Sequence, residues 1–473
     1  MSKKKGGYGY LAKNFGVLTI AQFGSKILSF LLVPLYTAVL TPEEYGLNDL
    51  FTTSITLLIP ILTLNVVDAT IRYAIDEQID KRNVFSISVM YITLGTVLFL
   101  ALLGINTAFH IFKSVEEYWF LIWLHFITSA VSTMVTGFAR GIDRVTDVAV
   151  SGIISTVVLL GSNILLLLVF KVGLTGYLIA ICLGPLSQIL YLAFRLRVWN
   201  YMSFNLRRLR RSKLRKEMIR YARPLIANAL AWWINSASDR YIVTWLCGVS
   251  VNGIYSVGYK IPSILAIFTN IFNQAWTLSA VKDFDPEDTN HFFTNMYNLY
   301  NFAATFVCSA LIASTKIAAR ILYSNEFYTA WQYVPFLLMA FVFSSLSGYL
   351  GGIFSAVKDS KIFARSTVIG AVVNIILNII MVYTAGAIGA AIATLISYIV
   401  IWVVRVLNSK KYVKIKFRFK RDFIAYAVMV AQSVLLFVVS NSIVLYISEF
   451  VCMAILLLMF RTETKNLIRK IKK

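Results

Sequence analysis

The first long apolar stretch of the chain, residues 14–40, reads NFGVLTIAQFGSKILSFLLVPLYTAVL. It exceeds the about 20 apolar residues that a membrane-spanning helix needs. Lys26 lies near its middle, with no carboxylate in the stretch, and a charge at that depth costs about 2.5–3.5 kcal/mol on insertion scales. Such a residue usually faces a wet cavity or a partner. The stretch therefore indicates a membrane protein with an interior pathway that favours anions.

Composition extends this interpretation to the whole chain. Of its 473 residues, 58% are hydrophobic and 14% are charged, whereas soluble domains carry about 25% charged residues. Lipid must therefore solvate much of the apolar surface. We predict an all-α polytopic membrane protein with about 14 transmembrane helices. The predicted spans lie near residues 14–40, 46–73, 83–112, 117–139, 146–170, 174–197, 218–246, 252–281, 291–318, 330–356, 362–384, 387–408, 422–441 and 443–460.

Lysine and arginine are distributed unevenly over the connections between spans, and the net charge is +23. One set of connections carries basic runs, at 207–216, at 410–421 and at both termini. The opposite set holds little beyond Lys113, Lys171 and Arg320. This bias predicts that both termini are cytoplasmic. Because the sequence has no phosphate-cradling loop and no RNA-binding motif, we expect no nucleic-acid partner.

The two halves of the chain resemble each other, which predicts two pseudo-symmetric six-helix lobes in the same orientation. We expect an N-terminal lobe at 1–198, a basic linker at 199–217, a second lobe at 218–408, and two extra helices with a basic tail at 409–473. We interpret the linker as a solvated connector that touches anionic lipid headgroups. The matched positions are Gly46 with Gly253, Phe138 with Phe354, Asp143 with Asp359, Asn163 with Asn378, Gly173 with Gly386, and Gly176 with Gly389.

Polar residues in the first span share one helix face. Gln22, Lys26 and Ser29 are spaced i, i+4 and i+7, so they project from the same side of a helix. We expect this stripe to face a central cavity, with Lys26 as its anion-binding charge. The alternative is a lysine that pairs with a carboxylate elsewhere in the fold.

The seventh and eighth spans supply a second polar set. The seventh carries a stripe on one helix face, followed by a cation: Asn228, Trp232, Asn235, Asp239 and Arg240. The eighth span carries Tyr259 and Lys260. We predict that Arg240 and Lys260 are cavity cations. We predict that Trp232, Asn235 and Tyr259 line the same cavity.

Three further residues have a functional and a structural interpretation. Asp68 and Arg72 are spaced i, i+4 in the second span, so they can form a local pair, or Arg72 can serve as a cavity cation. His125 stands alone in the fourth span, where hydrogen-bonded packing competes with a proton relay. The candidates for coupling transport to an ion are Asp68, Asp239 and His125.

Motifs of covalent chemistry are missing from the sequence. The three histidines are scattered and no HExxH or nucleophile elbow occurs, so we expect neither an enzyme nor a metal site. We expect no cofactor. The four cysteines lie in or beside apolar stretches far apart in the chain, which favours packing over disulfides.

Three segments together resemble one transporter family. Residues 22–51 (QFGSKILSFLLVPLYTAVLTPEEYGLNDLF), 235–261 (NSASDRYIVTWLCGVSVNGIYSVGYKI) and 372–398 (VVNIILNIIMVYTAGAIGAAIATLISY) resemble spans of bacterial Wzx-type polysaccharide flippases. These belong to the multidrug/oligosaccharidyl-lipid/polysaccharide (MOP) exporter superfamily. The resemblance implies alternating access in the bacterial cytoplasmic membrane. It implies an undecaprenyl-pyrophosphate-linked oligosaccharide as substrate, and a polysaccharide polymerase and glycosyltransferases as partners.

Three other functions remain as alternatives. Lipid II-type flippases carry arginines in the first two spans, whereas this first span has only Lys26. Ion-coupled drug exporters of the superfamily often use a first-span aspartate, which is missing here. A membrane glycosyltransferase or polymerase belongs to a different class and needs long external loops with acidic residues, whereas these loops are short and mostly basic.

The charge bias makes a prediction about topology. Single cysteines placed in the 207–216 run should be labelled by a membrane-impermeant maleimide only after the cells are opened, because the positive-inside rule puts this run in the cytoplasm. Cysteines beside Lys113 or Lys171 should be labelled in intact cells. Labelling of the 207–216 run in intact cells would reverse the predicted orientation.

Overall fold

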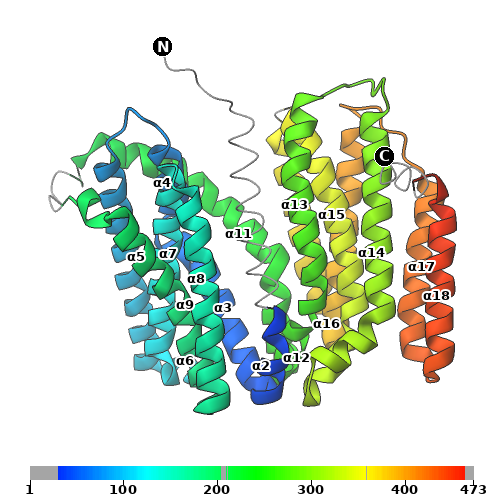
Figure 1. The fold of residues 1–473 in the computed structure, drawn as a ribbon, viewed down its shortest axis with the longest axis horizontal. Coiled ribbons are helices and arrows are strands. Elements are labelled where there is room, and N and C mark those ends of the chain that lie inside the picture. Colours follow the sequence, from blue (N-terminus) through cyan, green and yellow to red (C-terminus); the bar gives the residue numbers. More distant parts are fainter. Residues whose placement is uncertain (1–29, 204–208, 210, 358, 464–473) are drawn as a thin grey trace. The chain divides into compact units, whose positions relative to one another are not determined.

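A computed structural model describes residues 30–203, 209, 211–357 and 359–463 of the chain (Figure 1). This part of the chain is helical and contains no strand, which confirms the predicted all-α polytopic class. Contacts between Cα atoms divide it into two compact units, which meet in the chain between Trp233 and Ile234. We call them unit 1 and unit 2.

Unit 1 holds the helices that precede the division, and the division itself falls within α11. Two of them are not α-helical: η1 is a π-helix that continues α8, and η2 is a short 3₁₀-helix. The bounds are α2 Val33–Val39, α3 Pro42–Leu62, α4 Val66–Ala74, α5 Lys81–Phe109, α6 Lys113–Glu117, α7 Trp119–Gly141, α8 Val145–Asn163, η1 Ile164–Val169, α9 Gly173–Leu196, η2 Val198–Tyr201 and α11 Lys213–Cys247.

Unit 2 holds the end of α11 and all later helices. Among them, α17 and α18 are the two helices predicted beyond the internal repeat. The bounds are α12 Val249–Gly258, α13 Lys260–Lys282, α14 Phe292–Leu322, η3 Asn325–Gln332, α15 Val334–Ala356, α16 Ser360–Ser409, α17 Phe419–Val438 and α18 Ser442–Met459.

Ten helical segments among the described residues are long and apolar enough to cross a membrane. One of them, Lys361–Ser409, covers two predicted spans, because a single non-helical residue separates its halves. The predicted first span falls mostly on residues that the structure does not describe. The predicted seventh and eighth spans form α11 and the α12–α13 pair, and α11 starts inside the predicted linker. The domain boundaries as a whole stay a prediction.

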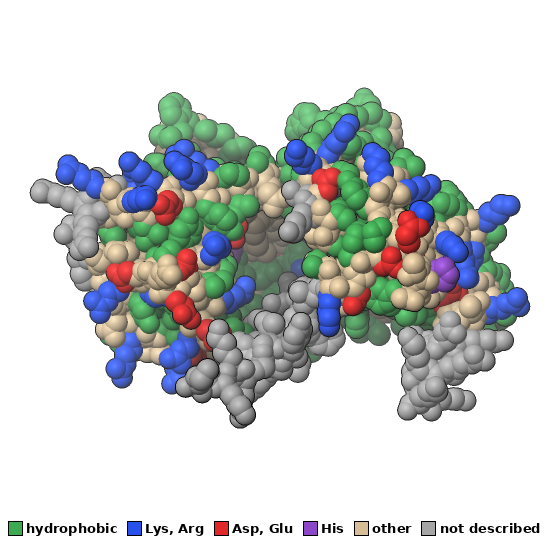
Figure 2. Space-filling model, turned by 90° about the horizontal axis from the view of Figure 1, so that it is seen from above, with side chains coloured by type: hydrophobic (Ala, Val, Ile, Leu, Met, Phe, Trp, Pro, Cys, Tyr) green, Lys and Arg blue, Asp and Glu red, His purple; other side chains and the backbone are tan. Residues whose placement is uncertain are grey.

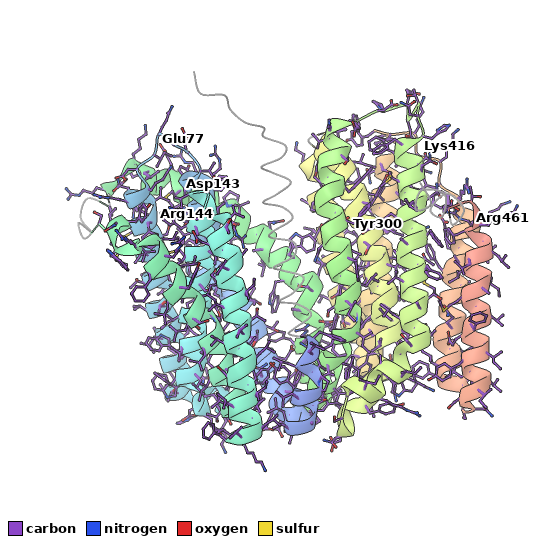
Figure 3. All side chains as sticks on the ribbon, viewed as in Figure 1. Glu77, Asp143, Arg144, Tyr300, Lys416 and Arg461 are labelled. Carbon is purple, nitrogen blue, oxygen red and sulfur yellow. The ribbon has the colours of Figure 1, made fainter. Side chains whose placement is uncertain are left out.

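Basic connections lie together within each unit. In unit 1, Glu77, Asp143 and Arg144 mark connections at one end of the helices, and in unit 2 Lys416 and Arg461 share one end (Figure 3). Figure 2 looks onto such an end of unit 1, where lysine and arginine side chains crowd the rim. Within each unit, these connections lie at one end of the helices, as expected if the basic connections all lie on the same side of the membrane.

The second predicted span, 46–73, is two helices rather than one. Leu64 and Asn65 have positive φ angles, 52° and 50°, and they separate α3 from α4. Pro60 lies in the last turn of α3 and lacks the N–H that a continuing helix needs. Asparagine tolerates the left-handed conformation better than most residues, so the break falls at Asn65.

The start of α3 also positions α9. Thr41 and Glu44 form a capping box, with the Thr41 N–H donating to Glu44 Oε2 at 2.8 Å. The other oxygen, Glu44 Oε1, accepts a hydrogen bond from the Leu174 N–H at 3.2 Å. Beside it, the rings of Tyr36 and Tyr177 stack at 4.4 Å. One carboxylate therefore holds the first turns of two helices that lie far apart in the sequence.

Matched positions of the internal repeat share their local structure. Gly173 and Gly386 have φ angles of +60° and +62°, a conformation that favours glycine. Asn163 and Asn378 are fully buried, and each donates from Nδ2 to the carbonyl four residues earlier, at 2.7 and 2.9 Å. These pairs support the pseudo-symmetry that the sequence predicts.

The second Asp of the repeat, Asp359, caps α16 outside the apolar segment. Its Oδ1 accepts hydrogen bonds from the backbone N–H of Lys361 and Ile362, at 3.1 and 3.3 Å. Its Oδ2 accepts from the Tyr412 hydroxyl at 2.7 Å. The Tyr412 hydrogen bond, more than the two N–H groups, holds the pKa of Asp359 below its usual value. The cap thus ties the start of α16 to the connection after its end.

A buried arginine fixes the packing of α15 and α16. Arg405 is 4% exposed, and its guanidinium donates to the Ser347 carbonyl, to Ser366 Oγ and to Thr367 Oγ1 at 2.7, 2.9 and 3.1 Å. The same group lies 4.2 Å from the ring centre of Phe363. Because these contacts satisfy the charged donors inside the protein, Arg405 acts as a structural residue.

The glycine pair in α16 generates a prediction about stability. A Cβ at Gly389 would lie 2.0 Å from the Met381 carbonyl oxygen, so Gly389→Ala must force two backbone segments apart. We expect it to lower the free energy of unfolding by about 1–3 kcal/mol. The matched control is Gly104→Ala in α5, where a Cβ would meet nothing within 4 Å. Alanine favours a helix over glycine by about 1 kcal/mol, so this control should not destabilise the protein. Thermal unfolding of the purified proteins in detergent measures both, and equal midpoints would contradict the packing described.

Candidate functional site

A buried carboxylate in unit 2 brings together three residues predicted from the sequence. Asp239 of α11 is 3% exposed and accepts a hydrogen bond from the Tyr255 hydroxyl of α12 at 2.7 Å. The Tyr259 hydroxyl also donates to it. The guanidinium of Arg240 lies 5.1 Å from the ring centre of Tyr259. We call these four residues the Asp239 cluster.

The cluster offsets the cost of burying a charge. A carboxylate without hydrogen bonds inside a protein is strongly unfavourable, and two phenol donors plus the Arg240 backbone N–H at 2.9 Å supply three. The positive charge of Arg240 lies over the face of the Tyr259 ring, an arrangement that stabilises a cation near an aromatic side chain. Asp239 and Arg240 are adjacent on the helix, so their side chains point in different directions. Tyr259 contacts both of them and thereby links the two charges into one polar group.

A second polar network anchors the same part of α11 to α16. Asn235 donates to the Thr367 carbonyl at 3.2 Å. Ser238 Oγ donates to Asn374 Oδ1 at 3.2 Å, and Asn374 Nδ2 donates to Thr394 Oγ1 at 3.4 Å. Because Asn374 and Thr394 lie on either side of the break at Gly386, the network reaches both halves of α16. Asn235 is 6% exposed, so it packs between helices in this structure.

The remaining predicted residues are spread over both units. Trp232 is exposed and Lys260, the first residue of α13, is half-buried. Arg72 and Asp68 are both exposed on α4. Asp68 accepts a hydrogen bond from Asn65 Nδ2 at 2.8 Å. The ion pairs among the described residues do not include a pair of Asp68 with Arg72, one of the two interpretations of these residues.

His125 and the first-span stripe complete the set. His125 is 8% exposed and its Nδ1 lies 3.3 Å from Ser129 Oγ on the same helix, which matches the packing interpretation. Gln22, Lys26 and Ser29 lie outside the described residues. Their predicted roles stay predictions.

One buried acid was missed by the sequence reasoning. Glu449 of α18 is 1% exposed, and its Oε2 accepts a hydrogen bond from Gln432 Nε2 of α17 at 2.8 Å. Gln432 Oε1 accepts from Ser309 Oγ of α14, also at 2.8 Å. Within the described part of the chain, Glu449 Oε1 has no hydrogen-bond partner. The rule that singles out Lys26, an isolated charge inside an apolar span, also identifies Glu449.

Metal binding has no support among the described residues. They contain no group of three or more histidine, cysteine, aspartate or glutamate side chains that could hold a metal ion. The cysteines Cys182, Cys247, Cys308 and Cys452 are all free thiols.

Comparison with known proteins identifies the family. Residues 11–277 match the family described as polysaccharide biosynthesis protein. A curated protein of Haloferax volcanii, described as "Probable low-salt glycan biosynthesis flippase Agl15", is 25% identical over 214 residues. That match covers 44% of this chain and 44% of the relative, so it spans less than half of the relative's length.

Solved structures share the fold along most of the chain. A lipid II flippase, MurJ, in an inward closed conformation has a TM-score of 0.70 at 13% identity, covering 96% of this chain and 99% of its own. An inward-facing multidrug resistance MATE transporter of the MOP superfamily also has a TM-score of 0.70, at 15% identity, covering 83% of this chain and 97% of its own. Together with the family match over more than half of the sequence, these folds confirm the predicted resemblance. The chain belongs to the family described as polysaccharide biosynthesis protein.

Proposed function

We propose that this protein is a flippase for an undecaprenyl-pyrophosphate-linked oligosaccharide repeat unit. It moves the unit from the inner to the outer leaflet of the cytoplasmic membrane by alternating access, for surface polysaccharide biosynthesis. The observation that carries this proposal is the family match over residues 11–277. The curated relative that is named a glycan biosynthesis flippase adds support.

The electrostatics of the chain suit an anionic substrate. A diphosphate headgroup carries negative charge through a region of low dielectric constant, where opposite charges nearby lower the cost. Arg240 and Lys260 supply two cations in unit 2. Lys26 of the first span supplies a third in our proposal, with Gln22 and Ser29 on its helix face. The protein itself makes and breaks no covalent bond in this function.

Lipid II transport is the second candidate function. The lipid II flippase fold covers 96% of this chain, whereas the MATE drug transporter fold covers 83%. Both candidates place a diphosphate-linked saccharide on a polyprenyl tail in the same pathway. They differ in the saccharide, so transport assays with each lipid distinguish them.

A direct assay tests the proposed function. Purified protein in liposomes should move a fluorescent polyprenyl-diphosphate oligosaccharide between leaflets, which makes the fluorophore accessible to an external quencher. Protein-free liposomes give the background rate. Movement of lipid II alone would favour the second candidate, and movement of neither lipid would contradict the flippase proposal.

Replacement of the first-span lysine tests its role in substrate binding. We expect Lys26→Ala to lower surface polysaccharide export about 10-fold or more, because a hydrogen bond to a charged group is worth about 1.5–3 kcal/mol. Lys113→Ala, an exposed lysine in a connection, is the matched control and should export normally. Expression of both variants is verified by immunoblot. Normal export by Lys26→Ala would remove Lys26 from the substrate pathway.

The Asp239 cluster generates a second mutational prediction. Asp239→Ala removes the carboxylate that accepts from the hydroxyls of Tyr255 and Tyr259, and we expect a loss of about 1–3 kcal/mol in the free energy of unfolding. Asp239→Asn keeps an acceptor oxygen, so it should be more stable than the alanine variant while it removes the charge. Asp68→Ala, at an exposed position, should change stability by less than about 0.5 kcal/mol.

Transport by the same variants separates structure from coupling. If the charge of Asp239 couples transport to an ion, Asp239→Asn should fold normally and transport slowly in the liposome assay. Wild-type transport by Asp239→Asn would limit Asp239 to a structural role.

A further inference from the structure

Two neighbouring cavities lie in unit 1, between α5 and the start of α11. The first, about 550 Å³, is lined by four cations of α11 opposite Tyr91 of α5. These cations are Arg215, Lys216, Arg220 and Arg223. We call it the basic cavity. Its volume falls in the range of about 300–1,000 Å³ typical of ligand sites.

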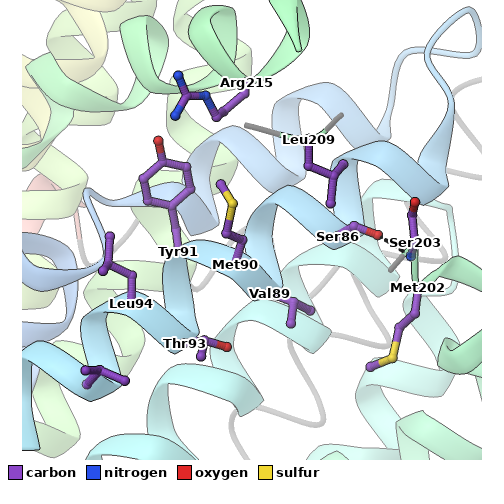
Figure 4. A pocket seen from close by; sticks show the side chains of 11 residues that line it. Ser86, Val89, Met90, Tyr91, Thr93, Leu94, Met202, Ser203, Leu209 and Arg215 are labelled. Carbon is purple, nitrogen blue, oxygen red and sulfur yellow. Dashed lines mark hydrogen bonds between the residues drawn. The ribbon is translucent and has the colours of Figure 1, made fainter. Parts of the chain in front are cut away.

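The second cavity, about 500 Å³, adjoins the first and is mostly apolar. Its lining includes Met90, Leu94 and Val97 of α5, with Met202 and Leu209 from the segment that follows η2. We call it the apolar cavity. Tyr91 and Arg215 line both cavities, and Figure 4 shows Arg215 above the Tyr91 ring at their junction.

The charge of the basic cavity is uncompensated among the residues that the structure describes. No carboxylate is among its described lining residues, and none of its four cations forms one of the ion pairs found in the described ranges. Glu217, on the same helix, lies 4.0 Å from Lys213, outside the cavity. Positive charge concentrated in a concavity attracts an anion.

Arg215 gives a second, independent indication of a ligand. Its Nε is buried and has no hydrogen-bond partner in the described part of the chain. A buried donor without a partner is unfavourable, so a ligand that places an acceptor at this position is stabilised by the new hydrogen bond. Arg215 stands at the junction of the two cavities, where the headgroup of a lipid meets its tail.

We propose that the two cavities together bind a lipid with a diphosphate headgroup. The diphosphate occupies the basic cavity, and the first part of the apolar chain occupies the apolar cavity. In the transport cycle this is where the substrate is captured before translocation, so the capture role rests on the proposed function. The sequence predicted a solvated linker at 199–217, which includes Arg215 and Lys216, whereas α11 already begins at Lys213 and its cations line a cavity.

Charge and shape favour this ligand over others. A phosphodiester lipid with one negative charge leaves most of the four cations unmatched, whereas a diphosphate diester offers two adjacent charges to arginine forks. Inorganic pyrophosphate leaves the apolar cavity empty. A neutral lipid leaves the basic cavity without an anion.

Binding to the full-length protein tests the proposal. The protein is placed in zwitterionic nanodiscs, and its affinity is measured for farnesyl diphosphate, farnesol, cardiolipin and inorganic pyrophosphate. We expect farnesyl diphosphate to bind at least about 10-fold tighter than each of the others, because it alone combines two directly linked phosphates with a single apolar chain. The double variant Arg220→Gln/Arg223→Gln should lose at least about 10-fold of this affinity.

Matched variants locate the site. Lys213→Gln removes a cation of the same helix outside the cavity and should change the affinity less than about twofold. Leu94→Gln, at an exposed position of the apolar cavity, should weaken farnesyl diphosphate and leave pyrophosphate unchanged. Unfolding midpoints equal to that of the wild type show that each variant is folded.

Several outcomes would overturn the proposal. Cardiolipin that binds as tightly as farnesyl diphosphate would make this a site for bulk anionic lipid. Pyrophosphate that binds as tightly would make it a site for free phosphate. If Arg220→Gln/Arg223→Gln loses binding and still transports normally in liposomes, the capture role fails and the flippase function stands. If the wild-type protein binds farnesyl diphosphate but moves no lipid, the proposed flippase function is wrong, whereas the lipid-binding site is confirmed.

Discussion

A polar group inside the hydrocarbon core of a bilayer is costly unless it finds a partner in the protein, because that region contains no water to bind it. The helical backbone satisfies this constraint along each span. The charged side chains satisfy it in small groups: Arg405 donates to three neighbours, Glu449 accepts from Gln432, and Asp239 accepts from two tyrosines. These groups join successive helices of the chain, α11 with α12, α15 with α16 and α17 with α18, so the same constraint that makes the chain helical also favours the packing of these helix pairs.

Much of the fold could be predicted from the sequence, since hydropathy and glycine spacing are local signals. The matched glycines Gly173 and Gly386 were found as a repeat, and both have positive φ angles. The break at Asn65 was not predicted, because the apolar pattern continues through it. For the candidate site, the stripe on α11 was predicted from helical periodicity, but the contacts of Asp239 with Tyr255 and Tyr259 depend on how α12 packs against α11.

The basic cavity was the hardest feature to predict, because the basic run that lines it already has a simpler explanation. A basic run between spans is expected at any cytoplasmic connection, so the sequence offered no reason to separate Arg215 from its exposed neighbours. The structure separates them because Arg215 lines two cavities together with Tyr91 of α5 and has a buried Nε. Concavity depends on tertiary packing, and a single sequence read by periodicity contains no direct measure of it.

The break at Gly386 also affects how the chain enters the membrane during synthesis. The two halves of α16 are joined by one non-helical residue, the Met381 carbonyl approaches Gly389 closely, and Asn374 reaches Thr394 across the break. A connection of one residue is too short to form a loop that would keep the first half in the membrane while the second half is still being synthesised. We therefore expect the two halves to insert together as a helical hairpin.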